Sequence, residues 1–411
     1  MSDQPAAPTR LPAGLVSFRH RNFRLWFGGQ LISMSGTWMQ IIAQGWLVYQ
    51  ISQSELVLGI YGFASAIPVL VVSPWAGVMA DRIPRRRLLL FTQTAFMLSA
   101  FILAGLTLAG VVQVWHIVLL GVAQGFINAF DTPARLAFGL DLVGREDLPN
   151  SIALGATMFN GARVIGPAVG GYLLAALGAG WCFFVNGVSF LAVIGGLLLM
   201  RFPALPVRPG AANPLGEILA GLRYVRGRRD ILGILGLTIT FGVVGMAYSS
   251  QLPAFVTSVL KADETGFGAL NTAVGLGALA GGIILAQYGT RLPRARLVNI
   301  TAFSYPLVLG AFAFIPGLVP AYPLAFLLGL GFLMLFNNFN SLLQLNTSNE
   351  MRGRVMSLYS LVFFGFSPFG SLIIGAVAER VPLPLTIGAS AALTLLMALG
   401  VYAAVPELRK I

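Results

Sequence analysis

Long apolar runs separated by short polar connections extend from one end of the chain to the other. Each run has the length of about 20 residues that a helix needs to cross the hydrocarbon core of a bilayer. None shows the alternation of apolar and polar residues that is typical of strands in a membrane barrel. The pattern predicts twelve helical spans, at roughly 23–51, 55–80, 88–110, 113–137, 148–178, 180–201, 230–258, 264–288, 297–316, 320–345, 354–378 and 382–405.

The long connection 202–229 divides the spans into two sets of six. It opens with several prolines and continues as an amphipathic segment beside a group of arginines. The apolar residues that share one face of this segment are Leu215, Ile218, Leu219, Leu222 and Val225. We expect a helix lying on the anionic inner surface of the membrane. The predicted units are a terminal segment 1–22, a six-helix bundle 23–201, the linker 202–229, a second six-helix bundle 230–405 and a tail 406–411.

The two sets of spans share a repeat with an offset of 209 residues. Arg82, Pro84, Arg85, Arg87 and Leu88 recur as Arg291, Pro293, Arg294, Arg296 and Leu297. Asn128, Asp131 and Arg135 correspond in the same way to Asn337, Asn340 and Gln344. Two halves of six spans with the same topology are typical of transporters that bind substrate between the halves and expose it to each side in turn.

Composition and charge agree with a membrane protein. Of the 411 residues, 57% are hydrophobic and 10% are charged, whereas a soluble protein carries about 25% charged residues. The net charge of +12 comes mostly from arginines in alternate connections, which places both termini in the cytoplasm by the positive-inside rule. Because the basic residues are spread over these connections, a nucleic-acid partner is not expected.

Residues that catalysis would require are sparse. Cys182 is the only cysteine, and the histidines His20 and His116 lie far apart in the sequence, which does not favour a metal site. No phosphate-binding G-x-x-x-x-G-K-[ST] sequence occurs, so ATP hydrolysis is not expected. We expect no cofactor and no metal. A membrane-embedded enzyme is a remote alternative because no converging acid–base residues can be identified.

Polar residues form one stripe along the first span, at helical spacings of three and four. These residues are Gln30, Ser33, Thr37, Gln40 and Gln44. Polar groups facing lipid would lack hydrogen-bond partners, so the stripe must face protein or water. It either lines a substrate cavity, the interpretation that we favour, or forms hydrogen bonds between helices. Further cavity candidates are Asn128 in the fourth span and Asn337, Asn340 and Gln344 in the tenth.

Two charged residues lie well inside predicted spans, Asp131 and Arg163. Charge within a membrane is costly and is usually retained for function. Arg163 is therefore a candidate for lining the cavity or orienting an anionic substrate, with a structural hydrogen-bonding role as the alternative. Asp131 is the acid within the spans that could take up a proton during transport. Neutral amides, aromatic residues and one arginine suit a bulky amphipathic or weakly anionic organic molecule better than a simple ion.

Two motifs resemble signatures of the major facilitator superfamily. The sequence GVMADRIPRRRLL resembles its loop between the second and third spans, although Pro84 replaces the usual glycine and changes the turn. The matching residues singled out in this loop are Gly77, Asp81, Arg82 and Arg85. The sequence ARVIGPAVGG resembles a signature of exporters that work as antiporters, and it contains Arg163, Gly166, Pro167, Gly170 and Gly171. The chain as a whole is similar to the bacterial branch that includes the enterobactin exporter and drug-efflux relatives.

The resemblance implies an all-α integral membrane fold of twelve helices in two parallel-related bundles. It implies proton-coupled export of a small organic compound, siderophore-like or amphipathic and drug-like, by a monomer among the lipids of a bacterial inner membrane. An uptake symporter or a lipid flippase of the same fold is the alternative. The resemblance also implies that Asp81 faces the positive end of the eleventh span. Arg82 or Arg85 is expected to reach Asp131, so that these residues act as a gate latch.

Overall fold

The computed structural model describes residues 12–201, 214–289 and 294–409, which form helices and no strand. The first half contains η1 (Ala13–Arg19), α1 (Arg21–Ser52), α2 (Glu55–Arg82), α3 (Arg85–Leu108), α4 (Val114–Leu177) and α5 (Ala179–Leu199). The second half contains α6 (Pro214–Arg226), α7 (Arg229–Ile239), η2 (Thr240–Gly245), η3 (Ala247–Gln251), α8 (Leu252–Ala254), η4 (Phe255–Val259), α9 (Glu264–Tyr288), α10 (Arg294–Ala313), α11 (Leu318–Asn346), α12 (Arg352–Ala378), α13 (Leu383–Ala404) and η5 (Pro406–Arg409).

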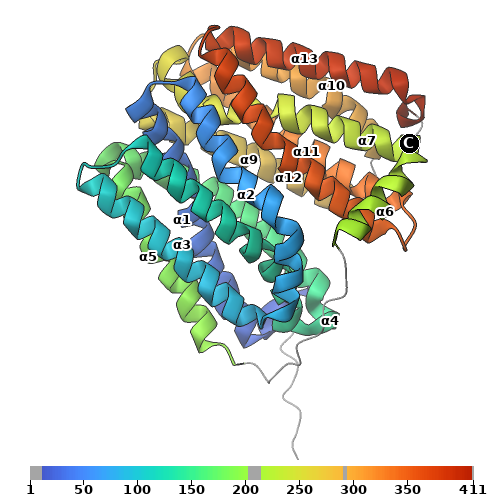
Figure 1. The fold of residues 1–411 in the computed structure, drawn as a ribbon, viewed down its shortest axis with the longest axis horizontal. Coiled ribbons are helices and arrows are strands. Elements are labelled where there is room, and N and C mark those ends of the chain that lie inside the picture. The colour runs from blue at the N-terminus through green and yellow to red at the C-terminus, as the bar shows by residue number, and fades with distance from the viewer. Residues whose placement is uncertain (1–11, 202–213, 290–293, 410–411) are drawn as a thin grey trace, which may run out of the picture.

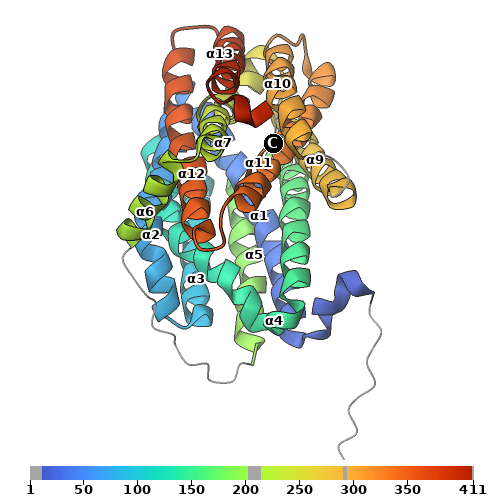
Figure 2. The same cartoon turned by 90° about the vertical axis from the view of Figure 1, so that its right-hand side faces the viewer.

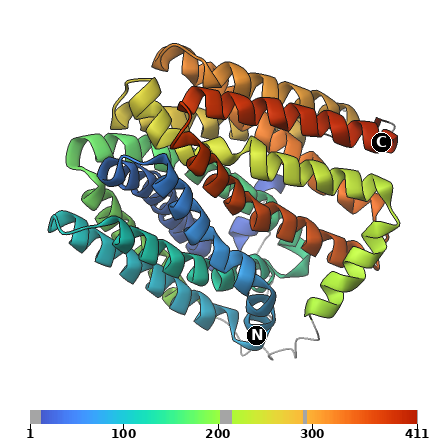
Figure 3. The ribbon, with the colours of Figure 1, turned by 45° about the horizontal axis from the view of Figure 1, so that its top comes forward.

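The long helices form two bundles that lie side by side (Figures 1 and 2). Helices α1 to α5 pack on one another in the first bundle, and α9, α10, α11 and α13 pack on one another in the second. The bundles meet through two main pairs of helices, α2 with α12 and α4 with α9. Figure 3 shows the first bundle, in blue to green, beside the second, in yellow to red. The bundle arrangement therefore follows the two halves of the sequence.

Helix α4 contains two membrane spans, because its backbone turns at Gly144. This residue has φ 75° and ψ −178°, a conformation that glycine adopts without the steric cost of a side chain. The two arms, residues 114–143 and 145–177, correspond to the fourth and fifth predicted spans. Ten helical segments are long and apolar enough to cross a membrane, and α4 is counted once among them. When the second arm of α4 is counted separately and α1 is added, the described residues contain all twelve predicted spans. The predicted all-α membrane fold is confirmed.

The seventh predicted span, 230–258, is an interrupted helix. Wide π turns in η2 and η4 and a tight 3₁₀ turn in η3 replace regular α-helix. Side chains of neighbouring helices bind carbonyl groups there: the Tyr305 hydroxyl donates to the Gly245 oxygen at 3.1 Å and the Ser390 hydroxyl to the Val244 oxygen at 2.6 Å. Backbone of this kind is tolerated at membrane depth only where protein or water satisfies its polar groups.

The predicted linker contributes one described helix, α6, which packs against α12. Gly221 lies against Arg354 and Leu358, and Val225 is buried, whereas Leu219 is 61% exposed. The prolines within 202–213 and the side chains of Leu215 and Ile218 lie outside the described residues. One end of the predicted apolar face therefore packs on protein, and the membrane-surface role stays a prediction.

A short helix precedes the first span and binds the turn within α4. The Arg19 Nε atom lies 2.7 Å from Asp147 Oδ2, and His20 Nε2 lies 2.7 Å from the same oxygen. The Ser17 backbone N–H donates to the Asn150 side chain at 2.9 Å. The sequence analysis assigned residues 1–22 only to a polar terminal segment and missed this helix. Its polar contacts fix the turn near Gly144 at the arginine-rich end of the bundle.

Candidate functional site

A carboxylate from the second half binds the first turn of a helix in the first half. Glu379, the residue after α12, accepts hydrogen bonds from the Ser54 hydroxyl at 2.8 Å and from the Leu56 N–H at 3.0 Å. Ser54 is the N-cap of α2 and also accepts from the Val57 N–H. The unpaired N–H groups and dipole of a helix start favour a negative charge. The Leu56 N–H, followed by the Ser54 hydroxyl, lowers the pKa of Glu379 below its ordinary value.

Two more hydrogen bonds join the halves near Glu379. The Gln251 Nε2 atom donates to the Glu55 backbone oxygen at 3.2 Å, and the Trp46 Nε1 atom donates to Glu264 Oε1 at 3.2 Å. Within 12–201, 214–289 and 294–409, these bonds and the two to Glu379 are the four hydrogen bonds that connect the halves. All four lie at the same end of the bundle, which we call the Glu379 end.

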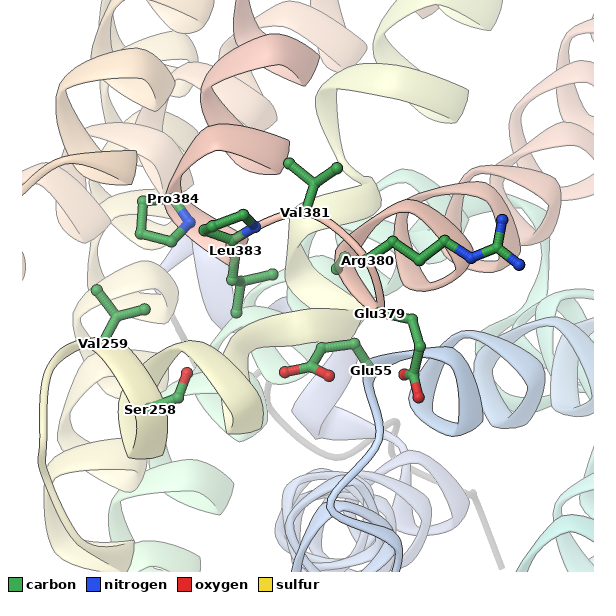
Figure 4. Close-up of a pocket in the computed structure, with 10 residues that line it drawn as sticks. Glu55, Ser258, Val259, Glu379, Arg380, Val381, Leu383 and Pro384 are labelled. Carbon is green, nitrogen blue, oxygen red and sulfur yellow. The ribbon is translucent and has the colours of Figure 1, made fainter.

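An open pocket of about 580 Å³ lies at the Glu379 end. Its lining residues come from α2, η4, the α12–α13 connection and the start of α13: Glu55, Ser258, Val259, Ala378, Glu379, Arg380, Val381, Pro382, Leu383 and Pro384. Figure 4 shows the carboxylates of Glu55 and Glu379 near each other, with the Arg380 guanidinium directed away from them. The pocket adjoins the junction between the halves and is a surface recess beside the contacts that close this end.

Glycines allow the two halves to approach closely at the Glu379 end. A Cβ atom on Gly171 of α4 would lie 2.5 Å from the Gly268 Cα of α9, and one on Gly59 of α2 would lie 2.6 Å from the Ser371 oxygen of α12. Such distances exclude any side chain, so small residues are needed where these helices cross. The exporter-like motif therefore contributes directly to the junction through Gly171.

The other residues of that motif pack against both halves. Gly166 lies against Ser35 and Trp38 of α1, and Gly170 lies against Met39 of α1. The carbonyl of Pro167 lies close to Gly268 of α9. The small residues of the motif therefore allow one face of α4 to pack closely against both α1 and α9. Sequence resemblance singled out these positions, and the structure provides a packing reason for each.

The basic loop lies at the opposite end, and its main contact differs from the expected one. Arg85 forms an ion pair with Asp141, at 2.8 Å between Nη1 and Oδ1, and not with Asp131. Arg82 is exposed, and the side chains of Gly77 and Asp81 lie outside the described residues. Because Arg85 and Asp141 belong to α3 and α4 of the same half, their pair stabilises one bundle. Sequence reasoning missed Asp141, since its position relative to α3 depends on how α4 packs.

Asp131 is buried among polar groups of its own half. Its Oδ1 atom accepts from the Thr92 hydroxyl at 2.7 Å and from the Gln93 Nε2 atom at 2.8 Å. Its Oδ2 atom lies 3.6 Å from the Arg135 Nε atom, one turn along α4. Asp131 is 1% exposed. These contacts satisfy a buried carboxylate and hold α3 against α4.

Arg163 lies at the boundary between the halves with aromatic rings from both. Its guanidinium carbon is 5.5 Å from the ring centre of Trp38 in α1 and 5.4 Å from that of Phe332 in α11. These distances are typical of cation–π contacts. The side chain is half-buried. Arg163 forms no hydrogen bond through its side chain and no ion pair with any described residue, so its charge has no anionic partner in that part of the chain.

Further aromatic rings extend this cluster on both sides. The Phe159 and Trp38 rings pack edge to face at 5.7 Å in the first half. In the second half, the centres of Phe332 and Phe336 are 4.7 Å apart, and those of Phe336 and Phe363 are 4.6 Å apart. We call these six residues, Arg163, Trp38, Phe159, Phe332, Phe336 and Phe363, the Arg163 cluster. It combines one positive charge with a large apolar aromatic surface between the bundles.

The polar stripe of α1 is largely buried against its own bundle. Gln30, Ser33, Gln40 and Gln44 are each 4% exposed or less, and Thr37 is half-buried. Gln40 Oε1 accepts from the Asn186 Nδ2 atom of α5 at 2.6 Å. This bond is the helix–helix interaction that the sequence left as the alternative. The Nε2 atoms of Gln30 and Gln44 are buried without a hydrogen-bond partner.

The remaining predicted amides make local contacts on their own helices. Asn128 Oδ1 accepts from the Thr132 hydroxyl at 3.0 Å, and Asn340 Oδ1 accepts from the Gln344 Nε2 atom at 2.6 Å. Asn128, Asn337 and Gln344 are exposed. Across the described part of the chain, no hydrogen bond joins these amides to the stripe of α1. The structure therefore places the candidate cavity residues in separate groups.

Comparisons with known proteins identify the family. The MFS_3 family, described as transmembrane secretion effectors, matches residues 13–410. The multidrug efflux pump Tap of Mycolicibacterium fortuitum is 26% identical over 93% of this chain and 95% of its own. The enterobactin exporter EntS of Shigella boydii is 26% identical over 87% of this chain and 85% of its own.

A solved structure shows the same fold. The bacterial homologue of the human lysosomal transporter Spinster, in an inward-facing and unoccupied conformation, superposes with a TM-score of 0.69 at 14% identity. The superposition covers 97% of this chain and 98% of the other. The family and both of these relatives, Tap and EntS, are transporters and not enzymes. The chain belongs to the major facilitator superfamily, in its MFS_3 family of transmembrane secretion effectors.

Proposed function

We propose that this protein is an alternating-access exporter that moves a small organic compound outward in exchange for protons. The observation that carries the proposal is the confinement of all four described inter-half hydrogen bonds to the Glu379 end. A rocking transporter closes one end through such contacts while the other end admits substrate. The fold of the family supports the transport mechanism, and the direction and the coupling ion are our proposal.

The arrangement of charge supports an inward-open conformation. The basic connections containing Arg85, Arg145 and Arg354 lie at the end opposite Glu379. The positive-inside rule assigns this basic end, with both termini, to the cytoplasm. The Glu379 end then faces outward, and the structure corresponds to the state that loads substrate from the cytoplasm. This assignment favours a bacterial inner membrane, where we propose that the protein acts as a monomer.

Export is supported by the names of two relatives, an efflux pump and a siderophore exporter. Proton coupling requires an acid that changes its protonation state during the cycle, and Asp131 is our candidate. Its carboxylate is buried and accepts two hydrogen bonds from α3, so its protonation would alter the contact between α3 and α4. The predicted latch role of Asp81 stays part of the proposal, and we expect Asp81→Asn to impair transport more than membrane insertion.

Transport by the purified protein in liposomes tests direction and coupling separately. Everted membrane vesicles and proteoliposomes are supplied with a panel of siderophores and amphipathic drugs, with and without an imposed pH gradient. Export predicts that compounds accumulate inside everted vesicles and that the rate rises when the vesicle interior is acidic. An accumulation rate that does not change with the pH gradient would overturn proton exchange. Accumulation of compounds only in right-side-out vesicles would overturn export. Movement of a fluorescent phospholipid without transport of any soluble compound would instead identify a flippase.

A further inference from the structure

The charge of Arg163 is unusual because no acidic residue that the structure describes pairs with it. Along the described residues, the acids of the first half that approach basic groups pair elsewhere: Asp131 with Arg135, Asp141 with Arg85, and both Glu146 and Asp147 with Arg19. The titratable groups that lie near Arg163 are the phenols of Tyr248 and Tyr305. A phenol has an ordinary pKa of about 10 and carries no negative charge at neutral pH. The site therefore retains a full positive charge at the junction of the bundles.

A charged side chain at membrane depth is energetically costly unless an opposite charge or water stabilises it. Ionised side chains inside a membrane are rare and pair with an opposite charge or line an aqueous path. Arg163 is half-buried and lies between helices of both bundles, at the boundary where transporters of this kind bind their substrate. An anion entering from that region would remove the electrostatic cost. The guanidinium can bind two oxygens of a carboxylate at once, which makes this geometry specific.

The rings around Arg163 restrict which anions fit. Trp38 and Phe332 lie on the guanidinium from opposite halves, and Phe159 and Phe363 continue the apolar surface, with the buried ring of Phe336 packed between Phe332 and Phe363. Aromatic rings pack against one another by edge-to-face and offset contacts, which favour a flat aromatic ligand over an aliphatic one. A small inorganic anion would leave these rings uncovered. The cluster thus combines an anion-binding group with an aromatic surface of larger area.

We propose that the Arg163 cluster is a binding subsite for organic anions that carry a carboxylate on an aromatic ring. The inference rests on the proposed transport function and specifies its substrate class. The carboxylate binds the Arg163 guanidinium, and the ring packs beside it against the neighbouring aromatic side chains, which include Trp38 of the first half and Phe332 of the second. Because both halves contribute, the ligand contacts the boundary that changes when the bundles rock.

Binding of matched probes tests the subsite without requiring transport. Equilibrium dialysis measures binding of 2-naphthoate and of its neutral analogue 2-naphthamide to the full chain in detergent, with empty micelles subtracted. We expect the wild type to prefer the carboxylate by about tenfold, as a charge-assisted hydrogen bond contributes. Arg163→Gln should lower naphthoate binding to the level of naphthamide and leave naphthamide unchanged. Equal binding of the two probes by the wild type would overturn the proposal.

Further variants keep the test informative if Arg163→Gln folds poorly. Arg163→Lys retains the charge but not the paired donors, so an intermediate preference is expected. Phe332→Leu should weaken the binding of both probes equally and leave the ratio of their affinities unchanged. Arg145→Gln removes an exposed arginine as the matched control and should bind as the wild type does. A carboxylate preference that survives in Arg163→Gln, or that falls equally in Arg145→Gln, would contradict the assignment.

Two further measurements separate the subsite from a lipid-binding site and from the transport function. If a lipid phosphate is the natural anion, wild-type protein in nanodiscs containing phosphatidylglycerol will bind naphthoate less well than in phosphatidylcholine nanodiscs, and that result overturns the proposal. If the preference for naphthoate is found but vesicles transport no compound, the subsite stands and the proposed transport function fails. If vesicles transport drugs but the protein shows no preference for the carboxylate, the transport function stands and the subsite fails.

Discussion

The Glu379 carboxylate accepts the backbone N–H of Leu56 at 3.0 Å and thereby joins the end of α12 to the first turn of α2. The same oxygen also accepts the Ser54 hydroxyl. A single side chain of the second half therefore satisfies two donors of the first half, one of them a backbone group that the helix itself leaves unpaired. We expect this contact to contribute to closure of the Glu379 end and to break each time that end opens.

Replacing this carboxylate should favour opening at the Glu379 end. Glu379→Gln removes a charge at a helix start, an effect of about 0.3–1 kcal/mol that corresponds to about a two- to fivefold change in population. Ser371 lies against Gly59 and Gly62 in the closed junction. In a protein whose own cysteine has been removed by Cys182→Ala, the labelling rate of Ser371→Cys measures the change in population. Arg380→Gln is the control, since its exposed guanidinium makes no described contact with α2. Identical labelling in Glu379→Gln and wild type would remove the gating role.

The gate should also depend on pH in a defined direction. The hydrogen bonds from Leu56 and Ser54 lower the pKa of Glu379 below its ordinary value of 4.5 in the closed state. Because the pKa of Glu379 is lower in the closed state, its charged form stabilises closure at any pH above the ordinary pKa. This stabilisation is lost as the pH falls through the lowered pKa. Labelling of Ser371→Cys, expressed relative to a fully exposed cysteine variant so that the pH dependence of thiolate formation cancels, should therefore stay constant between about pH 7 and 5 and rise only below the ordinary value. Glu379→Gln should abolish that rise.

Adding a methyl group at the glycine crossing should prevent closure. In Gly171→Ala the new Cβ would lie 2.5 Å from the Gly268 Cα, and a backbone atom cannot move aside easily. Overpacking of this kind costs about 1–3 kcal/mol, which should keep the Glu379 end apart and reduce transport. Gly161→Ala on the same arm of α4 meets nothing within 4 Å and is the matched control. Equal transport rates in the two variants would show that the halves need not approach so closely.

Asp131→Asn tests the proposed proton carrier. The amide oxygen can still accept from Thr92 and Gln93, while the ion pair with Arg135 is lost. We expect transport driven by a pH gradient to be largely lost, because an amide cannot take up and release the coupling proton as a carboxylate does. Asp141→Asn removes another carboxylate of α4 and serves as the comparison. Transport by Asp131→Asn that still responds fully to the gradient would exclude Asp131 as the carrier.

Gln40 can be assigned to packing or to substrate binding by one variant. Gln40→Ala leaves Asn186 of α5 without the partner that it has at 2.6 Å. If the residue joins helices, the melting temperature should fall, because an unsatisfied buried group costs about 1–3 kcal/mol. A cavity residue would instead change substrate affinity at constant stability. Combining Gln40→Ala with Asn186→Ala should restore part of the lost stability only in the first case.

The membrane spans, the two halves and the family could all be predicted from the amino-acid sequence. These features depend on length, hydropathy and local motifs, which are properties of short segments. The motif glycines around Pro167 were identified in the same way, because close helix contact requires the smallest residue wherever it occurs. Arg163 was recognisable as a candidate since a charge within an apolar span is conspicuous whatever surrounds it.

The partners that these residues contact could not be predicted, because they depend on how the helices pack. Arg85 binds Asp141 and not Asp131, Glu379 binds the start of α2, and Arg163 lies between Trp38 and Phe332. Helical periodicity specifies the face on which a residue lies, but not the neighbouring helix or the depth at which the two cross. Partner choice depends on the rotation and offset of packed helices, and these are set by the sum of many weak contacts along their whole length.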